Sequence, residues 1–250
     1  LVTGALDGPA GWVARHVVRA HGVRRRLGRP AGGRGRAPPP APRGGGVSRS
    51  PRAGGRPPGR PAAPAARQVC TEYADEALYH HSVRSYFFGA AWAQARGLDF
   101  DAELLYVAAL LHDLALTAPF DSHTVAFEEA GGDLARVFTA GLGWPTERRN
   151  RAAEVIVLHM RDTVTPEVDP ESRLLQVGTS ADVTGTGLDD FDPAFTQALV
   201  AAHPRLGFGP AFVQLFRDQA ERKPQCAAAG FVARGAEERA LAHPLDLDRG

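Results

Sequence analysis

The sequence predicts an all-α fold, a single helical domain preceded by a disordered arm rich in Arg, Gly and Pro. From about residue 72 onward, apolar residues recur at helical spacing, and no alternating strand pattern appears. The first 66 residues differ sharply, because they hold 14 of the 28 glycines and 11 of the 20 prolines. Residues 24–66 have almost no large apolar side chains, so burial cannot offset the entropy of ordering this backbone.

The charge of the chain divides at the same place. Thirteen arginines and one acid give residues 1–66 a formal charge of +12, whereas 16 basic and 27 acidic residues give residues 67–250 a charge of −11. The total of +1 therefore describes neither part. We expect a basic arm at 1–66, either disordered or the product of a misplaced gene start, a domain at 67–225, and a C-terminal helix and tail at 226–250.

The bulk sequence also excludes several classes of protein. No window approaches the roughly 20 apolar residues of a membrane-spanning helix, and no signal-peptide pattern is present. The two cysteines, Cys70 and Cys226, are too few and too far apart for a disulfide framework or a cysteine zinc site, which favours a reducing, cytoplasmic compartment. The Arg/Gly run at 32–36 has no interleaved aromatic residue for base stacking, so nucleic acid is not an expected partner.

The first eleven residues resemble the Gly-rich turn that opens short-chain dehydrogenases, where glycines let the backbone approach a pyrophosphate. Here the glycines stand at positions 4, 8 and 11, only three residues precede the first of them, and no βαβ unit follows. We therefore assign this stub no function.

The first two predicted helices are the best defined. A helix is expected at 75–96, where Gly97 ends it. The next begins near Asp101 and runs through residues 104–111, which are apolar on every face. Such a helix has no polar side to turn to water, so we expect it at the centre of the domain, buried all round.

Five more helices are expected at 132–139, 145–159, 173–184, 193–203 and 210–222. Pro145 and Pro193 stand where a first-turn proline is tolerated, and Asp192 is a suitable N-cap. Pro204 and Pro224 end the helices that precede them. Residues 231–250 are expected to form a short helix and a tail.

Several ionisable residues end or interrupt the apolar helical faces: His81, His112, Asp113, His159 and Asp182. A charged pair such as His112-Asp113 at the end of an apolar run is costly unless it is compensated, and metal coordination compensates it directly. A single histidine in such a place is more often a satisfied core residue. Several of them on separate helices favour a common site.

The order His81, His112-Asp113, Asp182 resembles the HD-domain superfamily of metal-dependent hydrolases, named for its adjacent His-Asp pair. Within it, HSVRSYFFG at 81–89, LLHDLALT at 110–117, FEEAG at 127–131 and PRLGF at 204–208 resemble the cyanamide hydratase-like branch. The resemblance spans about residues 72–222, so it implies that the domain at 67–225 is a helical HD domain.

This resemblance also implies the site. His81, His112, Asp113 and Asp182 match the metal ligands of the family, which would hold a divalent ion, zinc or iron foremost, with manganese as a further choice. His159 matches an additional histidine that lines the site or holds a second metal in some relatives.

Three further residues near the site are assigned from their positions. Arg84 lies one helical turn after His81 and is, with His159 and Asp113, a candidate catalytic residue. It is expected beside the metal, where it would hold a carboxylate or an anionic substrate, and the alternative is a surface salt bridge. His80 points about 100° away from His81 around the helix and is left out. His123 falls in an expected loop and is predicted to face solvent.

The residues around the His-Asp pair indicate the type of reaction. No Lys or Arg occurs between residues 97 and 134, and the only lysine of the chain is Lys223. A phosphoryl group would therefore lack the basic side chains that neutralise its charge. We therefore expect a metal-bound hydroxide to add to a small nitrile-like substrate, as in hydration of cyanamide to urea. His159, or the free oxygen of Asp113, would move the proton.

Two alternatives stay open. One is a metal-dependent phosphohydrolase acting on a nucleotide or another phosphate monoester. The other is an HD module that binds a ligand without turnover. The sequence also permits a homo-oligomer but does not demonstrate one.

Overall fold

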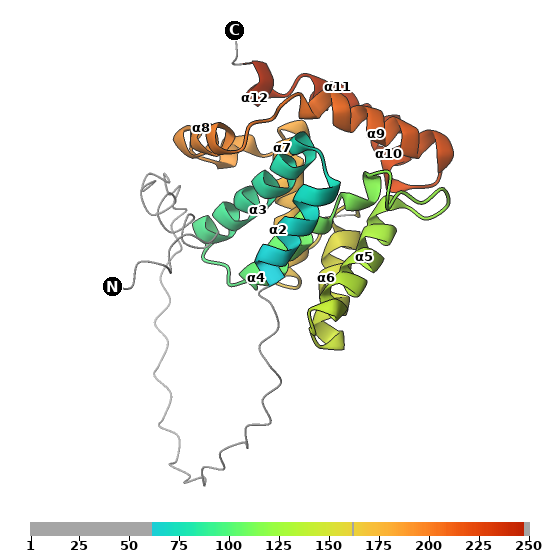
Figure 1. Cartoon of the computed structure of the whole chain (residues 1–250). Helices are drawn as coiled ribbons and strands as arrows, with labels where there is room; N and C mark the ends of the chain where they lie inside the picture. Colours follow the sequence, from blue (N-terminus) through green and yellow to red (C-terminus); the bar gives the residue numbers. More distant parts are fainter. Residues whose placement is uncertain (1–61, 162, 248–250) are drawn as a thin grey trace, which may run out of the picture.

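The computed structural model describes residues 62–161 and 163–247, and this part of the chain contains helices and no strand (Figure 1), which confirms the all-α prediction. Most of the basic arm and the dehydrogenase-like stub lie outside the described residues. The first helix of the described residues begins at Ala62, before the domain boundary that the sequence predicts at residue 67. Ala62 and Ala66 are both buried, so the end of the arm is part of the core.

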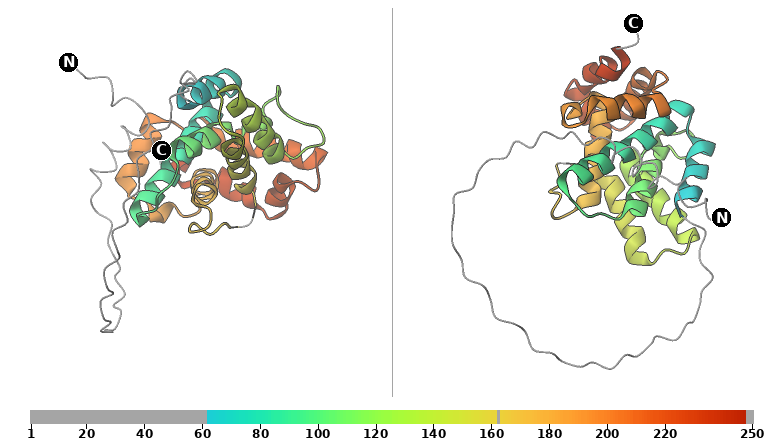
Figure 2. Two further views of the ribbon diagram at one scale, coloured as in Figure 1. Left: turned by 90° about the horizontal axis from the view of Figure 1, so that it is seen from below. Right: turned by 90° about the vertical axis from the view of Figure 1, so that its left-hand side faces the viewer.

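The helices follow one another as α2 (Ala62–Tyr73), α3 (Glu76–Arg96), α4 (Ala102–Leu111), the 3-10 turn η1 (Leu114–Leu116), α5 (Phe127–Gly141), α6 (Thr146–Leu158), α7 (Pro170–Thr184), the 3-10 turn η2 (Leu188–Asp190), α8 (Pro193–Ala202), α9 (Phe208–Arg222), α10 (Ala227–Ala233), α11 (Ala236–Leu241) and α12 (Pro244–Leu247). The pair α5 and α6 lies on one side of the domain, and α8 to α12 cover the opposite side (Figures 1 and 2).

Side-chain caps set several of the helix ends that the sequence predicts. The Asp75 carboxylate accepts a hydrogen bond from the Leu78 amide at 2.8 Å, and Asp101 accepts one from the Leu104 amide at 3.0 Å. At the other end of α3, Gly97 has a φ of 65°, a left-handed conformation that favours glycine and closes the helix. Asp192 caps α8 as expected.

Helix α4 is the central helix, as predicted. All of residues 104–111 are buried, and α4 packs against α2, α3, α6 and α7. Full burial of one Leu side chain contributes about 1.5 to 3 kcal/mol, so this segment anchors the core. The same burial holds the His-Asp pair that follows α4 in the interior.

Helices α3 and α7 cross with their backbones in contact. A Cβ at Gly178 would lie 2.0 Å from the Ser85 carbonyl oxygen, and one at Gly89 would lie 2.5 Å from the Leu174 carbonyl oxygen. Only glycine permits this approach. The crossing brings His81 on α3 and Asp182 on α7 together.

Some boundaries differ from the sequence prediction. Helix α5 begins at Phe127 rather than at residue 132, and it includes Gly131 and Gly132. These glycines are packing positions, since a Cβ there would lie 3.0 Å from the His112 carbonyl oxygen and 3.2 Å from the Ala153 carbonyl oxygen. Three short helices, α10 to α12, stand where the sequence predicts one helix and a tail. Among the described residues, none of the helices is long and apolar enough to cross a membrane.

His203, at the end of α8, makes the stability of the fold depend on pH. Its ring stacks on Phe87, with centroids 5.9 Å apart, and its Nδ1 lies 3.4 Å from Nδ1 of His80. Burial, and then the positive charges of His80 and Arg84, lower the pKa of His203 to about 4. Between about pH 6.5 and 4 the unfolded chain therefore binds a proton at this position that the folded chain does not bind.

We expect the free energy of unfolding to fall by about 1 to 2 kcal/mol through His203 as the pH drops from 6.5 to 4, because water screens part of the effect at this half-buried ring. Urea unfolding of the wild type and of His203→Asn across this range measures the difference. His123→Asn, at an exposed histidine, is the control and should follow the wild type. Parallel pH profiles of wild type and His203→Asn would contradict the assignment.

Candidate metal centre

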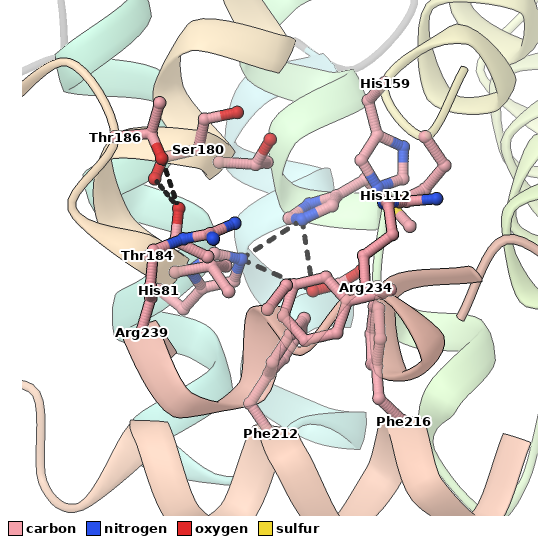
Figure 3. A pocket seen from close by; sticks show the side chains of 16 residues that line it. His81, His112, His159, Ser180, Thr184, Thr186, Phe212, Phe216, Arg234 and Arg239 are labelled. Atoms are coloured by element: carbon pink, nitrogen blue, oxygen red, sulfur yellow. Dashed lines mark hydrogen bonds and ion pairs between the residues drawn. The ribbon is translucent and has the colours of Figure 1, made fainter. Parts of the chain in front are cut away.

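Three side chains meet at the C-terminal end of α4. His81 comes from α3, His112 ends α4, and Asp113 follows it directly. His81 Nε2 lies 3.3 Å from His112 Nε2 and 3.3 Å from Asp113 Oδ2, and His112 Nε2 lies 3.1 Å from Asp113 Oδ2. All three side chains are buried, and Figure 3 shows the His81 and His112 side chains pointing toward one another.

The hydrogen bonds of the two rings determine which nitrogens carry protons. Nδ1 of His112 lies 2.7 Å from the Ala109 carbonyl oxygen, and a carbonyl can only accept, so this nitrogen donates its proton there. Nδ1 of His81 likewise donates to Asp182 Oδ2 at 2.7 Å. In the neutral rings both Nε2 atoms therefore present lone pairs to the cluster.

A divalent metal fits this arrangement. Asp113 Oδ2 is buried and has no hydrogen-bond partner in the described part of the chain, and the two Nε2 atoms beside it also present lone pairs. Three acceptors in contact repel one another unless a cation lies between them. Ligands held tetrahedrally at about 2.0 to 2.2 Å are about 3.3 Å apart, close to the observed spacings. Among the described residues, His81, His112 and Asp113 are the group whose donor atoms gather in this way.

The pKa values of the cluster also favour a cation. Burial alone opposes charge on His81, but Asp113 and Asp182 outweigh it and raise the pKa of this imidazole. Burial likewise opposes charge on Asp113, but His112 and His81 hold the pKa of its carboxyl well below the usual range. The site therefore combines an ionised carboxylate with the His81 imidazole, whose surroundings favour positive charge.

Asp182 lies on the far side of the His81 ring from this cluster. Its carboxylate accepts from Arg84 Nε at 2.7 Å and from Arg84 Nη2 at 2.8 Å, in addition to His81 Nδ1. Arg205 Nη1 lies 3.2 Å from Asp182 Oδ1 and donates to the Asp182 carbonyl at 2.7 Å. Burial opposes ionisation of Asp182, but Arg84 and then His81 lower the pKa of its carboxyl. The structure thus places Asp182 where it orients His81.

The Arg84 side chain holds the Asp182 carboxylate in place. Besides its two bonds to Asp182, its Nη1 donates to the carbonyl oxygens of His203 and Pro204, each at 3.0 Å. The side chain is fully buried and does not line the cavity described below. Its salt bridge is therefore buried rather than on the surface, and the carboxylate that it holds is that of Asp182.

His159 ends α6 and faces the cluster from another side. Its ring lies 4.9 Å from that of His112, edge to face, and its Nδ1 donates to the Ile156 carbonyl, which leaves Nε2 as the free lone pair. Burial, and then the charge of His112, lower the pKa of His159 to about 3. The ring is therefore neutral and weakly basic at physiological pH, and its Nε2 lone pair is available to a metal or to a hydrogen-bond donor.

A cavity of about 200 Å³ opens beside these side chains (Figure 3). His81, His112, Asp113 and His159 form its inner end. Phe212, Phe216 and Phe231 form an apolar wall, and hydroxyls of α7 and of the turn after it form another. Arg234 and Arg239 also line the cavity.

Some of these residues escape sequence reasoning. Arg205 lies in the PRLGF segment, yet nothing in its spacing reveals that it reaches Asp182. Phe208, in the same segment, stacks on the His81 ring with centroids 4.3 Å apart and an angle of 12°. The sequence sets residues 226–250 apart from the domain, but α10 packs on α9, α11 packs on α9 and α7, and both contribute to the cavity. His80 and His123 do not line it.

Comparison with known proteins agrees with this geometry. Residues 78–183 match the family model of the HD domain. Two proteins of Saccharomyces cerevisiae, the cyanamide hydratases DDI2 and DDI3, are each 30% identical to this chain over 179 residues, which cover 70% of this chain and 79% of each relative. The chain therefore belongs to the cyanamide hydratase-like branch of the HD superfamily and is a metal-dependent enzyme.

Proposed function

We propose that the protein hydrates a small nitrile-type substrate, in the manner of cyanamide to urea. The observation that carries the proposal is the buried cluster of His81 Nε2, His112 Nε2 and Asp113 Oδ2 at the end of a cavity. The likeness to two cyanamide hydratases supports the reaction type.

His81, His112 and Asp113 would hold the metal. A divalent ion such as zinc, iron or manganese supplies Lewis acidity that activates water and polarises the nitrile. Three protein ligands suit a catalytic site, because they leave positions for water and substrate. Their oxygen and nitrogen donors suit each of these ions.

His159 would move the proton. Hydration adds the hydroxyl of water to the nitrile carbon and a proton to the nitrile nitrogen. Because this ring is a weak base, its Nε2 at the inner end of the cavity would pass the proton from water directly on to that nitrogen rather than hold it. The contact between Nδ1 and the Ile156 carbonyl keeps the ring in the required tautomer.

Asp182 and Arg84 would act as positioning residues. The bond from His81 Nδ1 to Asp182 fixes the direction of Nε2, and Arg84 holds the carboxylate in place. Such outer partners orient a metal-bound imidazole and raise its basicity. In this proposal Asp182 supports a ligand, whereas the family resemblance alone implies that it is one.

We expect Asp182→Asn to weaken metal binding by about 10- to 100-fold, because the amide is a poorer acceptor for His81 Nδ1. Titration of the metal-free protein against a chromophoric chelator measures the affinity. Activity should recover at high metal concentration, which separates a positioning role from a loss of fold. Asp133→Asn, an exposed carboxylate on α5, is the matched control. Equal metal affinity in the two variants would contradict the role.

A second reaction, phosphate ester hydrolysis, gains support from one observation. The sequence argument against it is the lack of basic residues near the His-Asp pair, but Arg234 and Arg239 reach the cavity from the C-terminal helices. A metal flanked by guanidinium groups is also suited to phosphoryl transfer. The decisive experiment must therefore offer both types of substrate.

Elemental analysis of the purified chain, followed by assays with cyanamide and with a panel of phosphate monoesters, tests the proposal. We expect about one metal ion per chain, urea formation from cyanamide, loss of activity after chelation and recovery when the metal is returned. Phosphate release without urea formation would favour the second reaction and overturn the first. Metal binding with no turnover of either substrate would overturn both.

A further inference from the structure

Two arginines lie at the cavity without acidic partners. Arg234 follows α10 and Arg239 lies in α11, and both line the cavity that ends at the metal cluster (Figure 3). Within the described residues, no carboxylate pairs with either guanidinium. Both residues are exposed to water at the domain surface. Their charges are therefore available to a ligand.

Two neighbouring arginines, in contrast, have carboxylate partners. Arg217 on α9 pairs with Glu237 at 2.9 Å, and Arg205 pairs with Asp246 at 2.8 Å. The same C-terminal segment thus supplies carboxylates to other guanidinium groups. Arg234 and Arg239 face a space in which the only acidic lining residue is Asp113, which belongs to the metal cluster.

Hydroxyl groups also line the cavity, and Figure 3 shows Thr184 and Thr186 beside Arg239. Ser180 and Thr184 on α7, with Thr186 in the turn after it, line the cavity. Thr184 donates to the Ser180 carbonyl at 3.0 Å, and the Thr184 and Thr186 hydroxyls lie 2.7 Å apart. Because Thr184 gives its proton to the Ser180 carbonyl, Thr186 donates to Thr184. The guanidinium groups therefore remain as donors for an oxyanion, whose oxygens accept several hydrogen bonds at once.

The size of the cavity points to a substrate larger than cyanamide. An apolar cavity of about 150 Å³ admits benzene, which has six carbons. The cavity here measures about 200 Å³, whereas cyanamide has three non-hydrogen atoms. The space beyond the reacting group runs along the apolar wall of Phe212, Phe216 and Phe231.

We infer that the cavity contains an anion subsite, in which Arg234 and Arg239 bind the carboxylate or phosphate of a small organic substrate whose other end reacts at the His-His-Asp cluster. The inference deepens the proposed function and rests on it for the reacting end. The binding of the charged end depends on the two arginines alone. Carboxylate and phosphate share the chemistry that this subsite recognises, and experiment can separate them.

Calorimetric titration of the metal-loaded protein tests the subsite. The probes are 3-cyanopropionate, its uncharged counterpart butyronitrile, and inorganic phosphate. We expect the wild type to bind 3-cyanopropionate at least about tenfold more tightly than butyronitrile. Tighter binding of 3-cyanopropionate than of phosphate assigns the subsite to a carboxylate, and the reverse order assigns it to a phosphate.

The double variant Arg234→Gln/Arg239→Gln should lose this preference while keeping its metal content. Arg234→Lys/Arg239→Lys keeps the charges and should restore part of it. Arg136→Gln, an exposed arginine on α5 outside the cavity, should bind like the wild type. Equal affinity of the wild type for the charged and uncharged nitriles, or an unchanged preference in the double glutamine variant, would overturn the inference.

These binding results are independent of turnover. If cyanamide gives no urea but the charge preference is lost in the glutamine variant, the proposed hydration fails and the anion subsite stands. If urea forms and the preference is absent, the hydration stands and the subsite fails.

Discussion

His112→Ala should lose the metal and at least about a thousandfold of the activity. The imidazole supplies one of three donor atoms that lie 3.1 to 3.3 Å apart, and its Nδ1 bond to Ala109 aims Nε2 at the other two. A Lewis acid contributes several kcal/mol to such a reaction, and about 1.4 kcal/mol corresponds to a factor of ten in rate. Metal content by elemental analysis and urea formation from cyanamide are the two measurements.

His123→Ala is the matched control, since this histidine is exposed in the loop before α5 and does not line the cavity. It should keep both metal and activity. Circular dichroism of both variants checks that each remains folded. A His112→Ala protein that retains both its metal and its turnover would disprove the proposed metal centre.

Gly178→Ala should destabilise the protein by about 3 kcal/mol or more. The new Cβ would lie 2.0 Å from the Ser85 carbonyl oxygen, which is backbone and cannot rotate away. Helices α3 and α7 must therefore separate, and overpacking of this kind costs up to about 3 kcal/mol and occasionally more. Thermal unfolding should show a midpoint lowered by roughly 6 to 12 °C for a chain of this size.

Gly141→Ala provides the comparison for this change. It replaces a helical glycine at the end of α5 where a Cβ meets nothing within 4 Å, so it should leave the midpoint unchanged or raise it slightly. The separation of α3 from α7 should also weaken metal binding, because the same crossing aligns His81 with Asp182. Equal midpoints for the two variants would show that the crossing can relax.

Most of the helical framework is predictable because its signals are local. Asp75, Asp101 and Asp192 cap helices through bonds to amides two or three residues ahead, and Gly97 ends α3 through its own backbone angle. Helix α4 is recognisable as central because all its faces are apolar. Helix α2 is missed because its small and polar residues follow a long Pro- and Gly-rich stretch, and its packing partners on α4 are distant in sequence.

The metal cluster is predictable only in part. The adjacency of His112 and Asp113 and the resemblance to HD proteins point to His81 and to Asp182. The sequence does not reveal that Asp182 meets Nδ1 of His81 rather than the cluster, because this depends on the direction of side chains across the α3–α7 crossing. Nor does it show that Arg84 and Arg205 converge on that carboxylate.

The sequence by itself determined the helices, the central position of α4 and the residue types of a metal site, because caps, apolar periodicity and neighbouring ligands act over a few residues. Only the tertiary structure decided what surrounds the metal site. The unpaired arginines Arg234 and Arg239 lie about 120 residues after the His-Asp pair. Their approach to the cavity depends on how α10 and α11 pack on α9 and α7, a long-range arrangement that local patterns do not encode.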